Sequence, residues 1–600
     1  MKKVIYILAT VLMAASCQMD FYRSDTMTST MLQSNPGAAV YTTDGLYSMF
    51  KDVLLFEGSE YSNNTWVKHY FQMTEFRGDN VAQGRASEDP FTEIMNYKED
   101  NTKYNLGYFW YVSYKILFGA NSNIESLEKA EQTNDTQILL GENYFIRAFV
   151  HFALANIYAR PYYVEGRPSN ADQPCVVLRT STDCSVTEKA TVGKVYDQVE
   201  QDCLKAYDLL KDKKRRGNNG YVGWEAPLAL LSRMYLYKGD WDKCIQYSEQ
   251  LLGSDPLSHL EPTASLPTYF ANAQTSKETI WCINRSINDY QYSQHAQLGS
   301  MYYSSNGVGG IGWCEIYTTE PLVDLLFRWP DDKRRDAWFA FAAPIEGQYM
   351  VSWPEKPVKD QDYRLNVMVT SSSAKDAEGK TYYIPNVIPN ADGTFTVSTG
   401  GKTYTIKKQV VNKDVKYYIE GYETDAEDQD DITGGTRVFV RTAQDNAKGT
   451  RLTMPAYMCS KFTGQDGEEL LSSNVFFRYG EVVLNAAEAY AHKNDALNAI
   501  KYMNVVRERA GLSGDALYTT ANLSDSGYAN VLDAVLDERR IELMYEGFRQ
   551  LDLYRNGRPV NRRYAGVHDW EIISLDDLDA KFPCHIPYAE TVASGVTSNK

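Results

Sequence analysis

The stretch DERRIELMYEGFRQLDLYR, residues 537–555, says most about the fold. Its acids Glu538, Glu542 and Glu546 recur every four residues, which puts them on one face of a predicted amphipathic helix. Acid–base catalysis needs two carboxylates held across a cleft with separated pKa values, and one acidic stripe does not provide that. We therefore expect a helix docked into the fold by salt bridges. The arginines near enough in sequence to neutralise these acids are Arg539, Arg540, Arg549 and Arg555.

Two other blocks of the chain repeat each other. Residues 224–252 and 477–510 each have the periodicity of a helix, a short break and a second helix. A constant offset aligns Tyr235 with Tyr490, Lys238 with Lys493, Asp240 with Asp495, Ile245 with Ile500 and Tyr247 with Tyr502. Asp240 and Asp495 stand at the breaks, where a carboxylate can accept the free N–H groups of the next helix. This is helical-hairpin geometry of the tetratricopeptide type, with coincidental hairpins as the alternative.

The rest of the pattern completes a predicted architecture. Helical periodicity also covers residues 141–158 and 191–210, whereas residues 380–420 alternate with period two between glycine-rich turns. We predict a mainly α fold, a tetratricopeptide-like helical-hairpin scaffold with long loop excursions and a small β meander. The expected parts are an N-terminal helical part (39–254), a loop-rich and β-containing excursion that carries the ligand face (255–450) and a C-terminal helical part (451–600).

The N-terminus has the features of a secretion signal. Two lysines precede an apolar run, Val4 to Met13, which is too short to span a bilayer. Ala14-Ala15-Ser16-Cys17 follows and resembles a bacterial lipobox, in which Cys17 becomes the acylated first residue. We expect residues 1–16 to be a lipoprotein signal peptide and residues 17–38 a lipidated tether. An ordinary signal peptide with an incidental cysteine is the alternative.

Several classes of function are disfavoured by composition and motifs. The formal net charge of −17 argues against a nucleic-acid partner, because phosphate binding needs a clustered basic surface. No zinc-type spacing occurs, and the acidic residues 423–431 fit a solvated loop better than a calcium site. The SxxK match at 372–375 lacks its partner motifs. We therefore expect no metal, no cofactor and no catalytic residue. Cys175 and Cys184 flank a loop and could form a disulfide.

Aromatic residues in polar surroundings are the candidate ligand site. Sugar rings present flat C–H faces that pack on aromatic rings, while Asn, Gln and Arg side chains bind hydroxyls. Two polar stretches combine these residue types, near residues 63–71 and 285–313. The ligand-binding residues predicted from them are Trp66, Tyr70, Tyr290, Tyr292, Tyr302 and Trp313. The alternative for each ring is a place in the core, which is favoured for Trp281 in its apolar run.

Six motifs along the chain resemble those of the SusD/RagB family of surface nutrient-binding lipoproteins. They are Gly141–Tyr158, Val195–Leu210, Arg478–Tyr490, Asn504–Leu512, the segment 537–555 with its Glu546-Gly547-Phe548-Arg549 core, and Ile586–Glu590. The resemblance implies a tetratricopeptide-like scaffold that caps a SusC-like, TonB-dependent outer-membrane transporter and holds an oligosaccharide on aromatic platforms. The family's ligand residues are not part of these motifs.

The resulting hypothesis is a non-catalytic, lipid-anchored glycan-binding protein of the outer membrane that faces the cell exterior. It would concentrate oligosaccharide and deliver it to the transporter. A peptide-binding member of the same family, an envelope hydrolase with a carboxylate pair, and a pure tetratricopeptide assembly scaffold are the alternatives.

Overall fold

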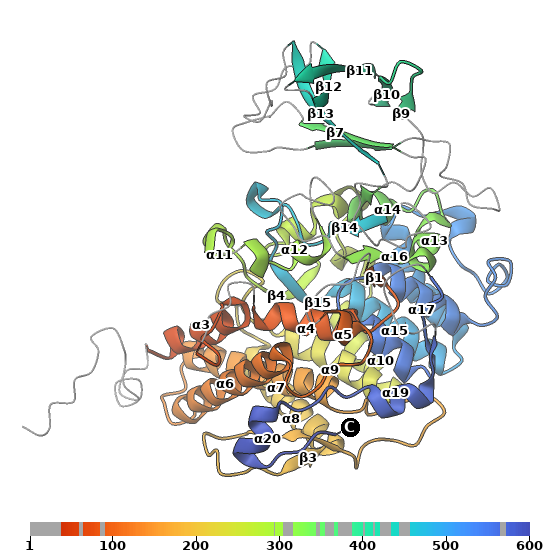
Figure 1. Cartoon of the computed structure of the whole chain (residues 1–600). Helices are drawn as coiled ribbons and strands as arrows, with labels where there is room; N and C mark the ends of the chain where they lie inside the picture. Colours follow the sequence, from red (N-terminus) through yellow and green to blue (C-terminus); the bar gives the residue numbers. More distant parts are fainter. Residues whose placement is uncertain are drawn as a thin grey trace, which may run out of the picture.

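The computed structural model has a helical body with a β-sheet unit beyond one end of it (Figure 1). The structure describes residues 38–58, 64–83, 91–292, 294–303, 316–343, 349–354, 365–369, 387–399, 402–411, 414–420, 434–442, 456–564 and 572–599. The mainly α class, the helical hairpins and the β meander predicted from the sequence are all present. Cys17, Trp313, the 372–375 motif and the acidic residues 423–431 lie outside the described residues.

The helices of the body pack on one another largely in chain order. Helix α3 (Ala38–Lys51) and α4 (Trp66–Glu75) lie against α6 (Tyr104–Leu127), and α6 packs on α7 (Asn134–Tyr158). The series continues through α8 (Val192–Leu210), α9 (Glu225–Lys238), α10 (Trp241–Leu252), α15 (Tyr479–His492) and α16 (Ala496–Arg509). Antiparallel helix pairs stacked in this way form one continuous core.

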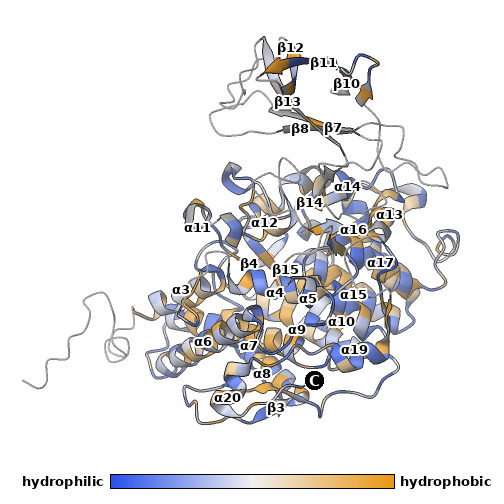
Figure 2. Cartoon of the chain, viewed as in Figure 1, coloured by the Kyte–Doolittle hydropathy of each residue, from blue (hydrophilic) through white to orange (hydrophobic). Residues whose placement is uncertain are grey.

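Helix α7 lies at the centre of this core. Every residue from Ile138 to Tyr158 is buried, and hydrophobic residues are spread along the central helices in Figure 2. Of the helices that the structure describes, α7 alone is apolar and long enough to cross a membrane, but 94% of its most apolar window is buried inside the molecule. It is therefore the core helix of the scaffold.

The two repeated hairpins have matching local geometry. Asp240 accepts a hydrogen bond from the Lys243 N–H (3.2 Å), and Asp495 accepts one from the Asn498 N–H (3.1 Å). The residue before each cap has left-handed backbone, Gly239 with φ 75° and the equivalent Asn494 with φ 59°. Glycine and asparagine adopt that conformation at the lowest cost. The predicted breaks and caps are therefore confirmed.

The acid/arginine segment is two helices joined by a turn. Helix α17 (Val531–Glu542) ends before a turn with left-handed residues at Tyr545 and Gly547, and α18 (Arg549–Arg555) follows. The four-residue spacing predicts that Glu542 and Glu546 share one helix face. This prediction is wrong, because the helix ends at Glu542 and Glu546 lies in the turn. Both carboxylates nevertheless reach Arg478, at 2.6 Å from Glu542 and 2.8 Å from Glu546.

The cations that neutralise the segment come mainly from other elements. Glu538 binds Arg334 and Arg507, whereas Glu546 binds Lys461 as well as Arg478. The arginines of the segment pair in turn with Asp79 and Glu488, and with Asp552 inside the segment. The expectation that Arg539, Arg540, Arg549 and Arg555 neutralise Glu538, Glu542 and Glu546 is wrong. The salt-bridged docking itself is present, and it joins distant parts of the chain.

The β-sheet unit has its own small core. Seven antiparallel strands run in the order β8-β7-β13-β12-β11-β10-β9. Their bounds are β7 (Tyr349–Pro354), β8 (Leu365–Val369), β9 (Val387–Pro389), β10 (Phe395–Thr399), β11 (Lys402–Val411), β12 (Asp414–Glu420) and β13 (Gly435–Thr442). Val351, Phe395, Val397, Ile406, Ile419 and Val438 pack together separately from the helical core.

A short ladder marks where the chain leaves and re-enters the body. Strand β6 (Phe339–Ala343) pairs antiparallel with β14 (Ala456–Cys459), and Ala343 lies opposite Ala456. The intervening chain, residues 344–455, therefore leaves the helical body and returns to it at adjacent positions. A second ladder, β4 (Thr279–Ile283) with β15 (Asn474–Arg478), ties the middle of the chain to the C-terminal helices.

Candidate functional site

Trp66 and Tyr70, two of the predicted ligand residues, lie in the core. Trp66 is 0% exposed, and its indole N–H donates to the Ser113 hydroxyl at 2.8 Å. Tyr70 is buried and stacks on Trp66, with ring centroids 5.4 Å apart and planes inclined by 8°. Rings covered on both faces present no surface to a sugar. The expectation that these two rings are exposed platforms is wrong.

The second predicted group is divided. Tyr290 is buried against Leu470 and Leu471, and Tyr302 is buried against Tyr545 with ring centroids 4.9 Å apart. These two rings are also not exposed. Tyr292 ends the short helix α11 (Ile287–Tyr292), but its side chain is not among those described, and Trp313 lies outside the described residues. The structure therefore brings no exposed platform together from the predicted set.

The error has a physical cause. The prediction of Trp66 and Tyr70 rests on their polar sequence neighbours, yet all ten residues of α4 are buried. Its polar groups are satisfied internally, as in the contact between His69 Nδ1 and Gln72 Oε1 at 2.9 Å. Burial lowers the pKa of His69 to about 3, so its ring stays neutral. A helix with hydrogen-bonded polar residues on every face can be fully internal.

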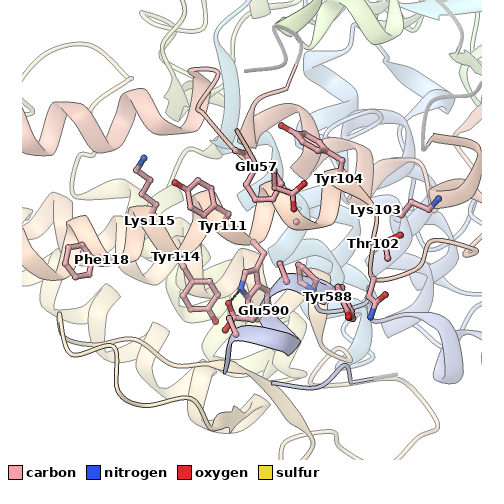
Figure 3. Close-up of a pocket in the computed structure, with 17 residues that line it drawn as sticks. Glu57, Thr102, Lys103, Tyr104, Tyr111, Tyr114, Lys115, Phe118, Tyr588 and Glu590 are labelled. Carbon is pink, nitrogen blue, oxygen red and sulfur yellow. Dashed lines mark hydrogen bonds between the residues drawn. The ribbon is translucent and has the colours of Figure 1, made fainter. Parts of the chain in front are cut away.

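A large cavity lies instead along the outer side of α6, where α20 (Tyr588–Ser594) lies beside it (Figure 3). Its volume is about 620 Å³, within the size range of small-molecule sites. We call it the aromatic groove. It is lined by Phe56, Glu57, Asn101, Thr102, Lys103, Tyr104, Gly107, Trp110, Tyr111, Tyr114, Lys115, Phe118, Pro587, Tyr588, Ala589, Glu590 and Ala593.

The floor of the groove is a stripe of rings on α6. Tyr104, Tyr111 and Phe118 are spaced by seven residues, so they recur every two turns on one side of the helix. Figure 3 shows these three side chains following one another along α6. Tyr111 is 39% exposed and Phe118 50% exposed. A soluble helix normally faces water with polar residues at such positions, so these rings are available to a ligand.

One wall is the loop that follows α3. The buried Tyr108 hydroxyl accepts from the Leu54 N–H at 3.0 Å, which fixes this loop against α6. The loop delivers Phe56 to the groove, where its ring lies edge-on to Tyr104 at 5.2 Å and tilted to Tyr111 at 5.3 Å. A Cβ on Gly107 would come within 3.1 Å of the Phe56 ring, so the close approach depends on that glycine.

The opposite wall is the C-terminal helix α20. The buried Arg77 guanidinium donates to the Phe582 carbonyl at 2.6 Å and the Lys581 carbonyl at 2.8 Å, which fixes the segment before the helix. The Tyr588 N–H donates to the Asn101 carbonyl at 2.8 Å, close to the start of α6. Tyr588 is 57% exposed, and its ring is therefore a second free aromatic surface, across the groove from the α6 stripe.

Polar groups are interleaved with these rings. The Glu590 carboxylate accepts from the Trp110 indole N–H at 3.3 Å and thereby joins the α20 wall to α6. The Tyr114 hydroxyl donates to the Val177 carbonyl at 2.9 Å, and burial raises its pKa well above the ordinary value, so it remains protonated. The Tyr111 and Tyr588 hydroxyls have no hydrogen-bond partner among the described residues. The site therefore offers apolar faces with free hydrogen-bonding groups beside them.

The described residues also include His, Cys, Asp and Glu side chains that bear on metal binding and disulfide formation. No group of three His, Cys, Asp or Glu residues suited to hold a metal occurs in the described ranges. Cys175 is buried and Cys184 exposed, and each thiol is free, so the suggested disulfide between them is absent.

Sequence reasoning missed the groove although α6 carries a signal. Residues 104–118 contain seven aromatic residues, more than one buried helix face accommodates. The excess indicates rings on the outer face. What the sequence does not reveal is the opposite wall, because Glu590 lies 480 positions from Trp110.

Two family models match the chain. The model described as the SusD family covers residues 277–581, and the model described as starch-binding associating with outer membrane covers residues 22–236. Among curated proteins, SusD-like protein P2 of Formosa agariphila is 21% identical over 80% of this chain and 76% of its own length. SusD-like protein P38 of the same organism is 21% identical over 82% of this chain and 80% of its own length.

Solved structures share the fold. A SusD superfamily protein from Bacteroides thetaiotaomicron superposes with a TM-score of 0.63 at 19% identity, over 94% of this chain and 99% of that one. A SusD-like carbohydrate binding protein from Bacteroides vulgatus gives a TM-score of 0.55 at 18% identity, over 88% and 84%. At these identities the structural likeness concerns the fold alone.

Proposed function

Since the chain belongs to the SusD family, we propose that it is a cell-surface glycan-binding lipoprotein. It captures an oligosaccharide nutrient and delivers it to a SusC-like, TonB-dependent transporter in the outer membrane. The single observation that carries the proposal is the aromatic groove, which combines exposed rings with free hydroxyl and amide groups on a scaffold of this family.

The groove suits a sugar for a chemical reason. A pyranose ring has C–H faces that pack on aromatic rings and hydroxyls around its edge that need partners. Tyr111, Phe118 and Tyr588 supply the faces. The side chains of Asn101 and Lys115 lie beside them without a hydrogen bond or ion pair to any described residue. A wholly apolar ligand would leave these polar groups desolvated and unpaired, which is costly.

The proposed location follows from two supports. One matching family model is described as associating with the outer membrane, and the sequence before Cys17 resembles a lipobox. Acylation of Cys17 would hold the protein on the membrane, because each buried methylene contributes about 0.8 kcal/mol. Replacing Cys17 with Ser should release the protein from the membrane fraction of producing cells, and retention of that variant on membranes would refute the lipid anchor.

We propose that the protein is not an enzyme. The acid/arginine segment is the stretch whose sequence most resembles an acid–base site. Its carboxylates are buried in ion pairs with arginines and a lysine, where a substrate has no access. Turnover of any glycan by the purified protein would reverse this assignment.

A binding experiment tests the function. The protein lacking residues 1–17 is titrated with oligosaccharides by calorimetry, beside Tyr111→Ala, Tyr588→Ala and the control Tyr41→Ala, whose exposed ring lies on α3 outside the groove. Binding should weaken in the two groove variants and persist in the control. Binding of peptides but not of sugars would instead support the peptide-binding alternative. Tyr292 and Trp313 remain proposed ligand residues, to be substituted in the same assay.

A further inference from the structure

A second, smaller cavity of about 130 Å³ adjoins the aromatic groove. The two cavities share Trp110, Tyr114, Phe118 and Glu590 in their linings, so they meet on the same part of α6. The smaller cavity extends past Phe118 toward Asn121, Arg179 and Ser181. The shared walls make one continuous depression along the helix.

The stripe of rings gives a length for the combined depression. Tyr104 and Phe118 lie fourteen residue steps apart on one helix, or ~21 Å at 1.5 Å per residue, which is the length of about four linked pyranose rings. Tyr114 lies at the junction, and its hydrogen bond to the Val177 carbonyl holds it in the wall. A ligand lying on the stripe can therefore continue from one cavity into the other.

The two ends differ in chemistry. The larger cavity is dominated by rings, whereas the smaller one brings the Arg179 guanidinium and the Ser181 hydroxyl to the far end of the stripe. The Arg179 guanidinium forms no ion pair with a carboxylate of the described residues, and the one hydrogen bond that it donates there is a long contact with the Asp183 carbonyl, at 3.4 Å. Its remaining N–H groups are available to oxygen atoms of a ligand.

We infer that the groove and the smaller cavity form one site for an extended, unbranched oligosaccharide of about four sugar rings, the length set by the stripe on α6. The apolar faces of successive sugars lie on Tyr104, Tyr111 and Phe118, and the end unit is hydrogen-bonded by Arg179. This inference rests on the proposed function and adds the shape and length of its ligand. Phe118 is the decisive residue, because it is the exposed ring among the residues that line both cavities.

The test is a chain-length series. Malto-, cello-, xylo- and galacturono-oligosaccharides of two to seven units are titrated into the protein lacking residues 1–17, and into Phe118→Ala, Arg179→Gln and the control Tyr41→Ala. For the oligosaccharide series that binds, the affinity should rise with chain length up to about four units and then level off. Phe118→Ala should lower the affinity for the longer chains about tenfold and leave that for the disaccharide unchanged. Arg179→Gln should likewise lower the affinity for the longer chains and leave that for the disaccharide unchanged.

The outcomes separate the two proposals. Saccharide binding that does not vary with chain length, or that Phe118→Ala reduces equally for short and long chains, overturns the extended site and leaves the glycan-binding function in place. If the unsubstituted protein binds none of the four oligosaccharide series, the glycan-binding function and the extended site are both overturned. Phe118→Leu, which keeps apolar volume but no ring, checks that any loss reflects stacking rather than misfolding.

Discussion

Glu542 shows how a surface-like sequence pattern becomes an internal one. Its side chain is fully buried, and the neighbouring Arg509, Arg478 and Arg334 guanidinium groups hold its pKa far below the ordinary value, against the opposing effect of burial. The acid and arginine pattern of the segment correctly indicated docking by salt bridges. It could not identify the partners of Glu542, because these arginines lie 33 to 208 positions away in sequence.

The first prediction concerns Glu542→Gln. Removing this carboxylate takes one counter-charge away from a cluster of three buried arginines, and we expect the free energy of unfolding to fall by about 3–5 kcal/mol. Urea unfolding at pH 7 measures the change. Glu508→Gln, on the exposed side of α16, is the matched control and should change stability by less than about 0.5 kcal/mol. Equal stability of the two variants would contradict the account of the buried ion network.

The pH dependence follows from the same group. Its pKa is lower in the folded protein than the ordinary 4.5, so below pH 4.5 the unfolded chain binds more protons than the folded one. Its contribution to stability is therefore present above about pH 4.5 and is lost as the pH falls further. Between pH 3 and 7, the free energy of unfolding should change less with pH for Glu542→Gln than for the unsubstituted protein. Parallel curves would show that Glu542 is not perturbed.

Trp66 provides a third residue-scale prediction. Because the ring is enclosed, Trp66→Ala should reduce the free energy of unfolding by about 3–5 kcal/mol through the cavity it leaves. The fraction that remains folded should bind oligosaccharide with unchanged affinity. Thermal unfolding and calorimetry on the same sample separate the two effects. Lost binding with unchanged stability would restore the original view of Trp66 as a platform.

At the scale of elements, the repeated hairpins were the most predictable part. Asp240 and Asp495 could be assigned as caps from their position after Gly239 and Asn494, because helix caps depend on local sequence. The packing inside each hairpin repeats as well. Tyr235 of α9 stacks on Tyr247 of α10, and Tyr490 of α15 stacks on Tyr502 of α16 in the equivalent place. Local rules therefore recovered both hairpins and their breaks.

The exposed face of α6 was not recovered, although its aromatic content was visible. Which face of an aromatic helix is covered depends on elements elsewhere in the chain, here the loop with Phe56 and the helix with Tyr588. Polar neighbours are a poor substitute for that information, as the buried α4 demonstrates.

The element-scale prediction is that Asp240→Ala lowers the free energy of unfolding by about 1 kcal/mol, because the first N–H groups of α10 lose their acceptor. Asp240→Ser, which can still cap the helix, should retain most of the stability. Urea denaturation of both variants measures the difference. A serine variant as unstable as the alanine variant would show that the carboxylate acts by another route.

At the scale of the whole molecule, the β-sheet unit is separable from the helical body. Its core is distinct, and Ala343 and Ala456 lie opposite each other where the chain leaves the body and returns. Replacing residues 344–455 with a two-residue Asn-Gly turn should preserve the β6–β14 pair and shift Tm by less than about 4 °C. Circular dichroism melting tests this, and loss of the helical transition would show that the body depends on the sheet.

The central claim is that the ligand lies along α6 and α20 rather than at the buried rings Trp66, Tyr70, Tyr290 and Tyr302. A crystal structure of the protein with the tightest-binding oligosaccharide of the length series tests it most directly. The account predicts sugar rings on Tyr111 and Phe118, with Tyr588 across the groove from them. Sugar density at Tyr292 or Trp313, with the groove empty, would contradict it.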